Sequence, residues 1–155
     1  MTRVRIASGL VGVLALSACL NVADPVANPT DPATETFAAS TGVDISKMTK
    51  TPHGAYYSDT AVGTGDTLST LRFVTITYRG YFKNGVIFDQ ATASTVLSLD
   101  SAIIGIAESM LGMREGGTRK IVVPSELGYG ARGFPTYGIP GNTTLVYDIT
   151  LVAVL

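Results

Sequence analysis

Residues 75–90 read TITYRGYFKNGVIFDQ, and this stretch decides the fold expected for the chain. Apolar and polar side chains alternate over residues 74–79, which is the period of two typical of a half-buried strand. Asn84-Gly85 comes next, a pair that tolerates positive φ and strongly indicates a hairpin turn. Residues 86–88 then predict the returning strand, which ends at Asp89. The stretch therefore predicts an antiparallel β-hairpin.

The carboxylate of Asp89 follows a buried aromatic run, and Tyr78 lies on the preceding strand. Two interpretations are open. Asp89 caps the turn at the end of its strand, or it belongs to a functional site with Tyr78. Spacing alone favours the turn cap, because Asp is a common residue at such positions.

The rest of the chain from residue 54 alternates short strands with a single helical segment. Residues 102–113 carry Ile103, Ile106, Met110 and Met113 at helical spacing, which predicts one amphipathic helix. Further strands are expected over residues 54–57, 92–98, 119–123 and 144–154, and a long Gly/Pro-rich loop over residues 128–142. This order predicts an α+β domain in which an antiparallel sheet wraps around one short α-helix. The sequence contains no internal repeats.

Length and composition narrow the functional classes. A chain of 155 residues is long enough for one domain with a core. The formal net charge of −1 offers no basic patch for nucleic acid, and no cluster of His, Cys and carboxylates indicates a metal site. His53 is the only histidine and has no Ser or Cys nucleophile at a recognisable spacing, while nothing places Asp89 and Glu126 together as paired acids.

The amino terminus has the three parts of an export signal. Arg3 and Arg5 precede an apolar run over residues 6–16, which is too short for a permanent membrane span, and small residues follow. We expect a signal peptide over residues 1–18. An ordinary secretory signal and a lipoprotein signal are both compatible with this pattern. Because the single cysteine, Cys19, closes the run Leu-Ser-Ala-Cys, the sequence favours the lipoprotein interpretation, with Cys19 lipidated.

Residues 19–42 are rich in Pro, Ala, Asn, Asp and Thr. Such a composition has little apolar surface to bury, so we expect a flexible tether between the lipidated cysteine and a domain over residues 43–155. Leu20 follows the cysteine, where Asp would be the commonest signal for inner-membrane retention. The expected location is the periplasmic side of a bacterial membrane, with the outer membrane as the default.

Three motifs resemble those of the FKBP-type peptidyl-prolyl cis-trans isomerases. They cover roughly residues 54–155 and occur in the order and at close to the spacing of that family. The first motif is Tyr78-x-Gly80-Tyr81 with Asn84-Gly85 and Phe88-Asp89. The second motif is Gly112-Met113-x-x-Gly116-Gly117-x-Arg119-Lys120-Ile121-x-Val123-Pro124 with Leu127-Gly128-Tyr129-Gly130. The third motif is Ile139-Pro140-x-Asn142-x-x-Leu145-Val146-Tyr147-Asp148-Ile149.

The resemblance implies a peptidyl-prolyl isomerase that assists the folding of exported proteins, with no cofactor and no metal. Position by position, it implies catalytic roles for Asp89 and Tyr129, the tyrosine hydroxyl donating to the carbonyl next to the proline. The substrate-binding residues implied are Tyr78, Phe88, Ala102, Ile103, Ile106, Phe134, Ile139 and Tyr147. Among these, Ile103 matches the residue whose backbone N–H binds a ligand carbonyl.

Two positions depart from the family pattern. Ile106 stands where the best-known members have the Trp that forms the pocket floor, and this chain has no Trp. The strand before the helix is expected to be shortened, with Thr95 or Leu97 in place of an aromatic wall residue. The resemblance therefore implies a reduced rate and weak affinity for macrolide ligands.

The expected partners are proline-containing polypeptides, macrolide ligands with weak affinity, and a membrane contacted through the lipid anchor only. No nucleic acid is expected, and a monomer is the default because no amphipathic dimerisation helix is visible. Two other functions are compatible with the sequence: a chaperone-like module that binds Pro-containing segments with little turnover, and an envelope lipoprotein that uses the fold as a scaffold. Retention of Tyr78, Phe88, Asp89, Ile103 and Tyr129 together argues against the scaffold.

Overall fold

The computed structural model describes residues 31–70 and 72–155, and its central feature is one antiparallel sheet. Its six strands are β1 (Thr49–Lys50), β2 (Tyr56–Ala61), β3 (Phe73–Phe82), β4 (Ile87–Ser98), β5 (Thr118–Val123) and β6 (Leu145–Val154). They lie in the order β1-β2-β5-β6-β3-β4, and every neighbouring pair is antiparallel. The predicted sheet class is confirmed.

The expected hairpin joins β3 to β4 at the predicted place. Phe82 and Val86 close the loop, with the Val86 carbonyl accepting from the Phe82 N–H at 2.9 Å. Of the two turn residues only Gly85 takes positive φ, at +87°, while the Asn84 side chain accepts from the Val86 N–H at 3.0 Å. The turn is thus a three-residue loop in which only Gly85 has positive φ. It is not a two-residue turn in which both residues have positive φ. The two returning segments expected over residues 86–88 and 92–98 form the single strand β4.

One α-helix, α1 (Ile104–Met110), lies within the predicted range of residues 102–113 but is shorter. Ile103 has extended backbone angles and caps the helix, so the helix begins after it. Gly112 has a φ of +80°, a left-handed conformation that ends helices. The other helical elements of the described residues are three-residue 3₁₀ turns: η1 (Pro32–Thr34), η2 (Ala39–Thr41), η3 (Ile45–Lys47), η4 (Ser125–Leu127), η5 (Gly130–Arg132) and η6 (Pro135–Tyr137).

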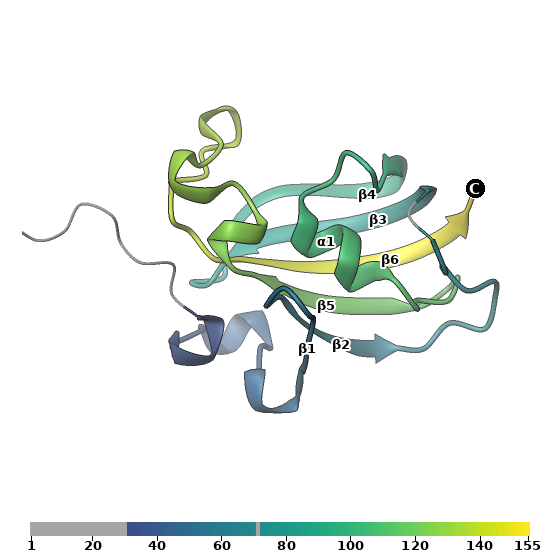
Figure 1. Ribbon diagram of the computed structural model, residues 1–155, viewed down its shortest axis with the longest axis horizontal. Helices are drawn as coiled ribbons and strands as arrows, with labels where there is room; N and C mark the ends of the chain where they lie inside the picture. The colour runs from purple at the N-terminus through teal and green to yellow at the C-terminus, as the bar shows by residue number, and fades with distance from the viewer. Residues whose placement is uncertain (1–30, 71) are drawn as a thin grey trace, which may run out of the picture.

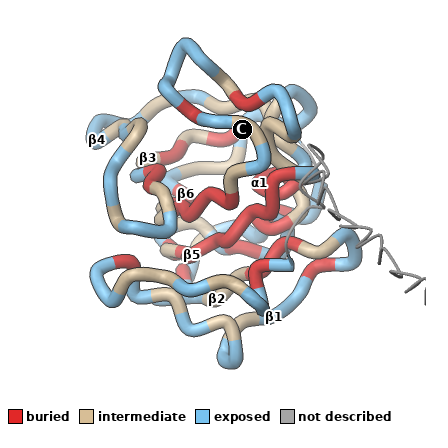
Figure 2. The backbone as a smooth tube through the Cα atoms, turned by 90° about the vertical axis from the view of Figure 1, so that its left-hand side faces the viewer, coloured by how far each residue is buried: buried red, intermediate tan, exposed pale blue. Residues whose placement is uncertain are grey.

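The main core lies between α1 and one face of the sheet. Figure 1 shows α1 in front of β5, β6 and β3, and Figure 2 shows long buried stretches in β5 and β6. Alternate residues of β6 face the helix, and all are buried: Leu145, Tyr147, Ile149 and Leu151. The helix comes close to the sheet at Gly105, where a Cβ atom would lie 2.5 Å from a methyl group of Val123.

Arg119 on β5 joins the carboxyl-terminal end of α1 to the edge of the sheet. Its guanidinium donates to both carboxylate oxygens of Asp59 on β2, at 2.7 and 3.0 Å. It also donates to the backbone carbonyls of Ser109, at 2.7 Å, and Leu111, at 3.1 Å, which lie at the end of the helix. The Tyr57 ring lies 4.2 Å from the guanidinium carbon. One side chain therefore holds β2, β5 and α1 together.

The N-terminal segment, residues 31–48, covers part of the opposite face of the sheet. Its apolar side chains, Phe37, Val43, Ile45 and Met48, contact a second buried cluster formed by Tyr56, Tyr81, Val122 and Val146. Ion pairs hold it further: Lys83 with Glu35 at 2.8 Å, and Lys50 with Asp31 at 2.9 Å. Residues 31–42 were expected within the flexible tether. They lie against the sheet, where Phe37 contacts the second cluster and the Ala38 N–H donates to the Lys83 carbonyl at 2.8 Å.

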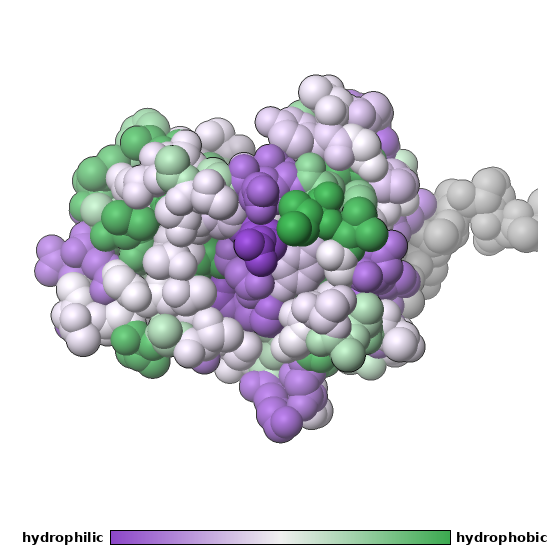
Figure 3. All heavy atoms as spheres, turned by 180° about the vertical axis from the view of Figure 1, so that it is seen from behind, coloured by the Kyte–Doolittle hydropathy of each residue, from purple (hydrophilic) through white to green (hydrophobic). Residues whose placement is uncertain are grey.

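A buried polar network lies beneath this segment. Lys120 donates to Asp148 at 2.5 Å and also contacts the hydroxyl of Tyr81, which donates to Asp148 at 2.8 Å and to the Thr41 carbonyl at 3.2 Å. Hydrophilic residues gather in the middle of this face of the molecule (Figure 3). The network links β3, β5 and β6 to the N-terminal segment.

The predicted signal peptide, Cys19 and residues 19–30 of the predicted tether lie outside the described residues. Within the described part of the chain, no helix is long and apolar enough to cross a membrane.

The contact between Gly105 and Val123 yields the first prediction. Gly105→Ala places a methyl group against Val123, and overpacking of this kind costs about 1–3 kcal/mol. The gain in helix propensity is at most ~1 kcal/mol. We expect the free energy of unfolding in urea to fall by about 1 kcal/mol or more.

A matched change on the same helix serves as the control. Ser109 is fully buried, and its hydroxyl has no hydrogen-bond partner among the described residues. Ser109→Ala removes this hydroxyl without adding volume, so stability should stay within about 0.5 kcal/mol of the wild type or rise. Equal midpoints for Gly105→Ala and the wild type would contradict the close approach of helix and sheet.

Candidate functional site

A cavity of about 300 Å³ opens between α1, the helix-facing side of the sheet and the loop that follows β5. The structure brings eight of the ten predicted catalytic and substrate-binding residues to its wall: Tyr78, Asp89, Ala102, Ile103, Ile106, Tyr129, Phe134 and Tyr147. They come from three strands, the helix, its N-terminal approach and a loop, so residues far apart in the sequence share one wall.

The base of the cavity is apolar. Ile106, on the buried side of α1, is 8% exposed, and Ile76 and Ile149 line the cavity from neighbouring strands. Ile106 thus lies where the family resemblance places the floor residue. A branched aliphatic side chain keeps the floor apolar but covers less area than an indole ring.

Tyr78 and Asp89 form the polar part of the wall. The Tyr78 hydroxyl donates to a carboxylate oxygen of Asp89 at 2.6 Å. Burial, and then the hydrogen bond to Asp89, raise the pKa of Tyr78. The hydroxyl therefore stays protonated and fixes the orientation of the carboxylate at the cavity wall.

Gly80 makes room for the aromatic packing behind this wall. A Cβ atom there would lie 2.7 Å from the Phe88 ring and 2.9 Å from the Tyr147 ring. Without a side chain at Gly80, Phe88 and Tyr147 meet edge to face, with ring centres 5.6 Å apart. Phe88 also contacts Phe82 at 5.1 Å. The Tyr147 ring is thereby held in a fixed position.

Two of the predicted substrate-binding residues are not in the cavity wall. Phe88 lies behind Tyr147, and Ile139 is 3% exposed within the core, where its backbone pairs with Phe134. Both side chains support residues that line the cavity. The positional resemblance does not separate a wall residue from the residue behind it.

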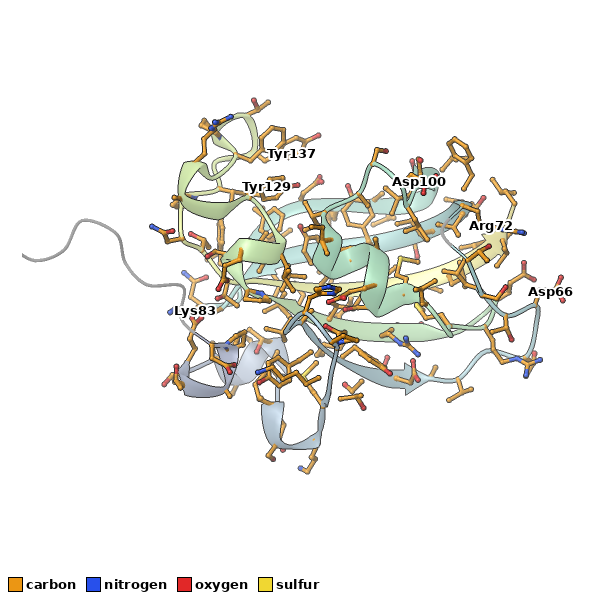
Figure 4. The ribbon with its side chains drawn as sticks, in the orientation of Figure 1. Asp66, Arg72, Lys83, Asp100, Tyr129 and Tyr137 are labelled. Atoms are coloured by element: carbon orange, nitrogen blue, oxygen red, sulfur yellow. The ribbon has the colours of Figure 1, made fainter. Side chains whose placement is uncertain are left out.

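Tyr129 enters the cavity from the loop between η4 and η5. Its ring stacks on Phe134, with centres 5.0 Å apart and planes 9° apart. Burial raises the pKa of Tyr129, and burial likewise raises the pKa of Tyr147. Both hydroxyls therefore stay protonated near neutral pH, and each has one proton to donate. Figure 4 shows Tyr129 pointing from its loop toward the side on which α1 lies.

Four lining residues were not among the predicted site residues: Ile76, Leu97, Ser101 and Ile149. Strand alternation could have identified Ile76 and Ile149, because each lies two residues from a predicted wall tyrosine and so on the same face. Leu97 was one of two candidates for the altered wall position, and it lines the cavity. Ser101 lies in the turn before the helix, and no sequence signal marks it.

Within the described residues, no group of three or more His, Cys, Asp or Glu side chains could hold a metal ion. His53 pairs with Glu108 at 2.6 Å and is not in the cavity wall. What the cavity offers is an apolar base, fixed aromatic walls and protonated hydroxyls. Such a site can hold a small apolar ring while donating a hydrogen bond to an adjacent carbonyl.

Comparison with known proteins gives one family. Residues 65–152 match the sequence model of the FKBP-type peptidyl-prolyl cis-trans isomerase family. The FKBP-type peptidyl-prolyl cis-trans isomerase FkpA of Escherichia coli is 37% identical over 123 residues, covering 77% of this chain and 43% of that protein. FK506-binding protein 4 of Rhizopus delemar is 36% identical over 111 residues, covering 69% of this chain and 29% of that protein.

Solved structures give the same result. A peptidyl-prolyl cis-trans isomerase from Pseudomonas syringae superposes with a TM-score of 0.66 at 30% identity, covering 74% of this chain and 87% of that one. The structure of Escherichia coli FkpA superposes with a TM-score of 0.63 at 32% identity, covering 68% of this chain and 50% of that one. The chain spans less than half the length of the two curated relatives named above.

The buried Tyr147 hydroxyl gives a pH-dependent prediction. Its pKa is raised on folding, so above pH 10 the unfolded chain releases a proton that the folded chain retains, and stability falls as pH rises. Tyr147→Phe removes this contribution. Between about pH 10.5 and 11.5, the unfolding free energy of the variant should fall less steeply than that of the wild type, by about 1.4 kcal/mol per pH unit.

Urea unfolding at intervals of pH measures this slope, and values near pH 8 give the reference for the loss of the hydroxyl itself. Identical slopes above pH 10 for the two proteins would show that the hydroxyl is not buried as described.

Proposed function

Because this chain belongs to the FKBP-type peptidyl-prolyl cis-trans isomerase family, we propose that it catalyses the cis-trans isomerisation of X–Pro bonds in polypeptides. The observation that carries this proposal is the cavity, which combines an apolar base with the hydroxyl of Tyr129 and the carboxylate of Asp89. The matched range, residues 65–152, contains every residue that lines it.

The reaction needs no nucleophile and no metal. Rotation about the X–Pro bond crosses a barrier that arises from amide resonance, about 18–20 kcal/mol for a peptide bond. The twisted amide has lost this resonance and is less dipolar than the planar amide. An apolar cavity from which water is excluded therefore favours the twisted form relative to water. In this proposal the proline ring lies over Ile106, between the walls formed by Tyr78 and Tyr147.

The polar groups orient the amide. The Tyr129 hydroxyl donates to the carbonyl next to the proline, and the backbone N–H of Ile103 donates to a second carbonyl of the substrate. Asp89 stays fixed by its bond with Tyr78 and sets the electrostatic field at the edge of the pocket. Donors placed before the substrate arrives cost little reorganisation when the amide twists.

Ile106 sets the expected strength of binding. It offers less surface to the proline ring than the Trp of the best-known family members, so we expect reduced affinity for macrolide ligands and a reduced rate. This observation also favours a second candidate function, a chaperone-like module that binds Pro-containing segments with little turnover. The rate on a proline-containing peptide separates the two functions.

Export and anchoring complete the proposal. The sequence pattern of residues 1–19 supports a signal peptide over residues 1–18, lipidation of Cys19 and a location on the periplasmic side, with the outer membrane as the default. The substrates would then be exported proteins that are folding near the membrane, and the chain would act as a monomer.

Substitutions at Tyr129 and Asp89 test the site. A neutral hydrogen bond is worth about 0.5–1.5 kcal/mol, so Tyr129→Phe should lower kcat/KM by a few-fold to about tenfold. Asp89→Leu should cost at least as much, because it also removes the partner of Tyr78. The measurement is a protease-coupled isomerisation assay on an X–Pro peptide, with thermal unfolding of each variant recorded alongside.

Tyr56→Phe is the matched control, because it removes a tyrosine hydroxyl that bonds to Asp31 and lies outside the cavity wall. It should leave turnover unchanged. Wild-type turnover at the uncatalysed level would favour the binding module instead. Full turnover in both Tyr129→Phe and Asp89→Leu would refute the assignment of the pocket.

The anchor is tested by Cys19→Ser. Without the thiol, diacylglyceryl transfer is impossible, so the variant should lose labelling by a radioactive fatty acid and move from the membrane to the soluble fraction. A wild-type protein that is already soluble, with its mature chain beginning elsewhere than at Cys19, would refute lipidation.

A further inference from the structure

Strand β4 forms one edge of the sheet, on the side away from β1 (Figure 1). Among the described residues only β3 pairs with it, so its outer side presents backbone N–H and C=O groups that no strand covers. With twelve residues, β4 is the longest of the six strands. A long open edge of this kind is a template on which another extended chain can pair.

β4 lacks most of the features that protect an open edge from such pairing. The strand contains no Lys, Arg or Pro, and its one charged residue, Asp89, is hydrogen-bonded to Tyr78. One protective feature is present, because residues 92–94 bulge between Ala91 and Thr95, which both have partners on β3. Residues 95–98 beyond the bulge pair regularly with β3, and their outer side stays open.

The hydrogen bonds around residues 95–98 show which backbone groups point outward. The Leu99 N–H donates to the Arg72 carbonyl at 3.2 Å, which lies on the β3 side. Successive residues of a strand bond to opposite sides, so Leu97 also bonds toward β3, whereas Val96 and Ser98 point away from it. The Ser98 carbonyl accepts from the backbone of the following turn at 3.3 Å. The N–H and C=O of Val96 and the N–H of Ser98 therefore remain for an added strand.

Apolar side chains lie beside this edge on both faces of the sheet. Val96 is 60% exposed, and Phe73 on β3 is 56% exposed. Phe73 pairs with Ser98, and Thr75 pairs with Val96, so Phe73 and Val96 lie on one face as diagonal neighbours. Leu97 points to the other face and lines the cavity. Residues 90–99 include no charged side chain, so an uncharged, β-branched segment suits this edge.

The same strand forms part of the cavity wall, through Asp89 and Leu97. The proposed isomerase function, on which this proposal rests, places a proline of the substrate polypeptide in that cavity. An extended segment of four residues spans about 13 Å, and an added strand lies about 4.8 Å from its neighbour. Residues within a short distance of the proline can therefore reach the edge while the proline stays in the cavity.

We propose that the outer edge of β4 over residues 95–98 binds an extended, uncharged segment of the substrate polypeptide by strand addition. Main-chain hydrogen bonds supply affinity in this mode of recognition, and side chains on alternate positions supply preference. The segment pairs with Val96 and Ser98, and its side chains contact Val96 and Phe73 on one face. The edge thus holds a β-prone stretch of a non-native chain next to the proline that is isomerised.

The first experiment compares two fluorescently labelled peptides of equal length, each with one Ala-Pro pair. One carries the segment Thr-Val-Thr-Val and the other Gly-Ser-Gly-Ser, and both are made with the segment before and after the proline. Fluorescence anisotropy gives their affinities for the wild type. In at least one of the two orders, the Thr-Val peptide should bind about tenfold more tightly, because a Gly/Ser segment loses more entropy on becoming extended and brings no apolar side chain.

N-methylation of the peptide tests the hydrogen bonds without altering the protein. Methylating both Val residues or both Thr residues of the segment removes N–H groups from opposite edges, because successive N–H groups point to opposite sides. One methylated peptide should bind as weakly as the Gly-Ser peptide, and the other as tightly as the unmodified one. Equal binding of the two methylated peptides, whether tight or weak, overturns the proposal.

Two substitutions at one position test the edge itself. Val96→Pro removes an outward N–H at the kind of position where an edge strand tolerates proline, and should abolish the preference for the Thr-Val peptide. Val96→Thr retains the N–H and a β-branched side chain, and should keep the preference. Val96 does not line the cavity, so kcat/KM on a short Ala-Pro tetrapeptide should be unchanged in both variants. A preference that survives Val96→Pro overturns the proposal.

Failure of the proposed function would look different. If the wild type does not turn over the tetrapeptide, the isomerase activity is refuted, and the anisotropy of the four peptides still decides whether the edge binds an extended segment. Light scattering tests the other occupant of an open edge, a second copy of this chain. A dimer that Val96→Pro dissociates, with no preference between the Thr-Val and Gly-Ser peptides, overturns the proposal in favour of self-association.

Discussion

The cavity depends on the position of one short helix above the sheet, and Arg119 holds the carboxyl-terminal end of that helix. Its side chain is 5% exposed, and it directs donors to Asp59 on β2 and to the last carbonyls of α1. A helix of seven residues has little stability of its own in water. Fixing its carboxyl-terminal end leaves the amino-terminal end, with Ile103 and Ile106, in place as the base of the cavity. Losing the guanidinium would leave the Asp59 carboxylate without its partner and the helix carbonyls unpaired.

Two glycines allow close packing around the cavity because they have no side chain. Gly105 lets α1 approach Val123, and Gly80 lets the rings of Phe88 and Tyr147 meet. The first contact sets the depth of the cavity and the second fixes one of its walls. The N-terminal segment stabilises the same sheet from behind, through Tyr81 and its contact with Thr41. Both faces of β3 and β6 are therefore constrained, and the cavity wall has little freedom to move.

Local patterns predicted the parts of this structure that depend on local physics. Alternation over residues 74–79 predicted strand β3, and the Asn84-Gly85 pair predicted the hairpin, because both depend on neighbouring residues. The segment over residues 31–42 was misjudged because its composition does not reveal a sheet face that needs cover. Phe88 and Ile139 could not be placed behind the wall, because that depends on the distance between elements. The stacking of Tyr137 on Phe134 was not predicted for the same reason, since the two rings meet across a turn.

The carboxylate of Asp89 in the cavity wall is already hydrogen-bonded within the protein, and this matters for the proposed isomerisation. Asp89 is hydrogen-bonded to Tyr78, so its carboxylate has a partner before any substrate enters. Burial keeps the hydroxyls of Tyr129 and Tyr147 protonated. Apart from Ser101, the remaining wall is aliphatic or aromatic, and such a surface disfavours a planar, dipolar amide more than a twisted one. Isomerisation makes and breaks no covalent bond, so this difference between the planar and the twisted amide can by itself raise the rate. The proposed reaction therefore depends on the shape of the cavity and on the exclusion of water more than on a reactive side chain.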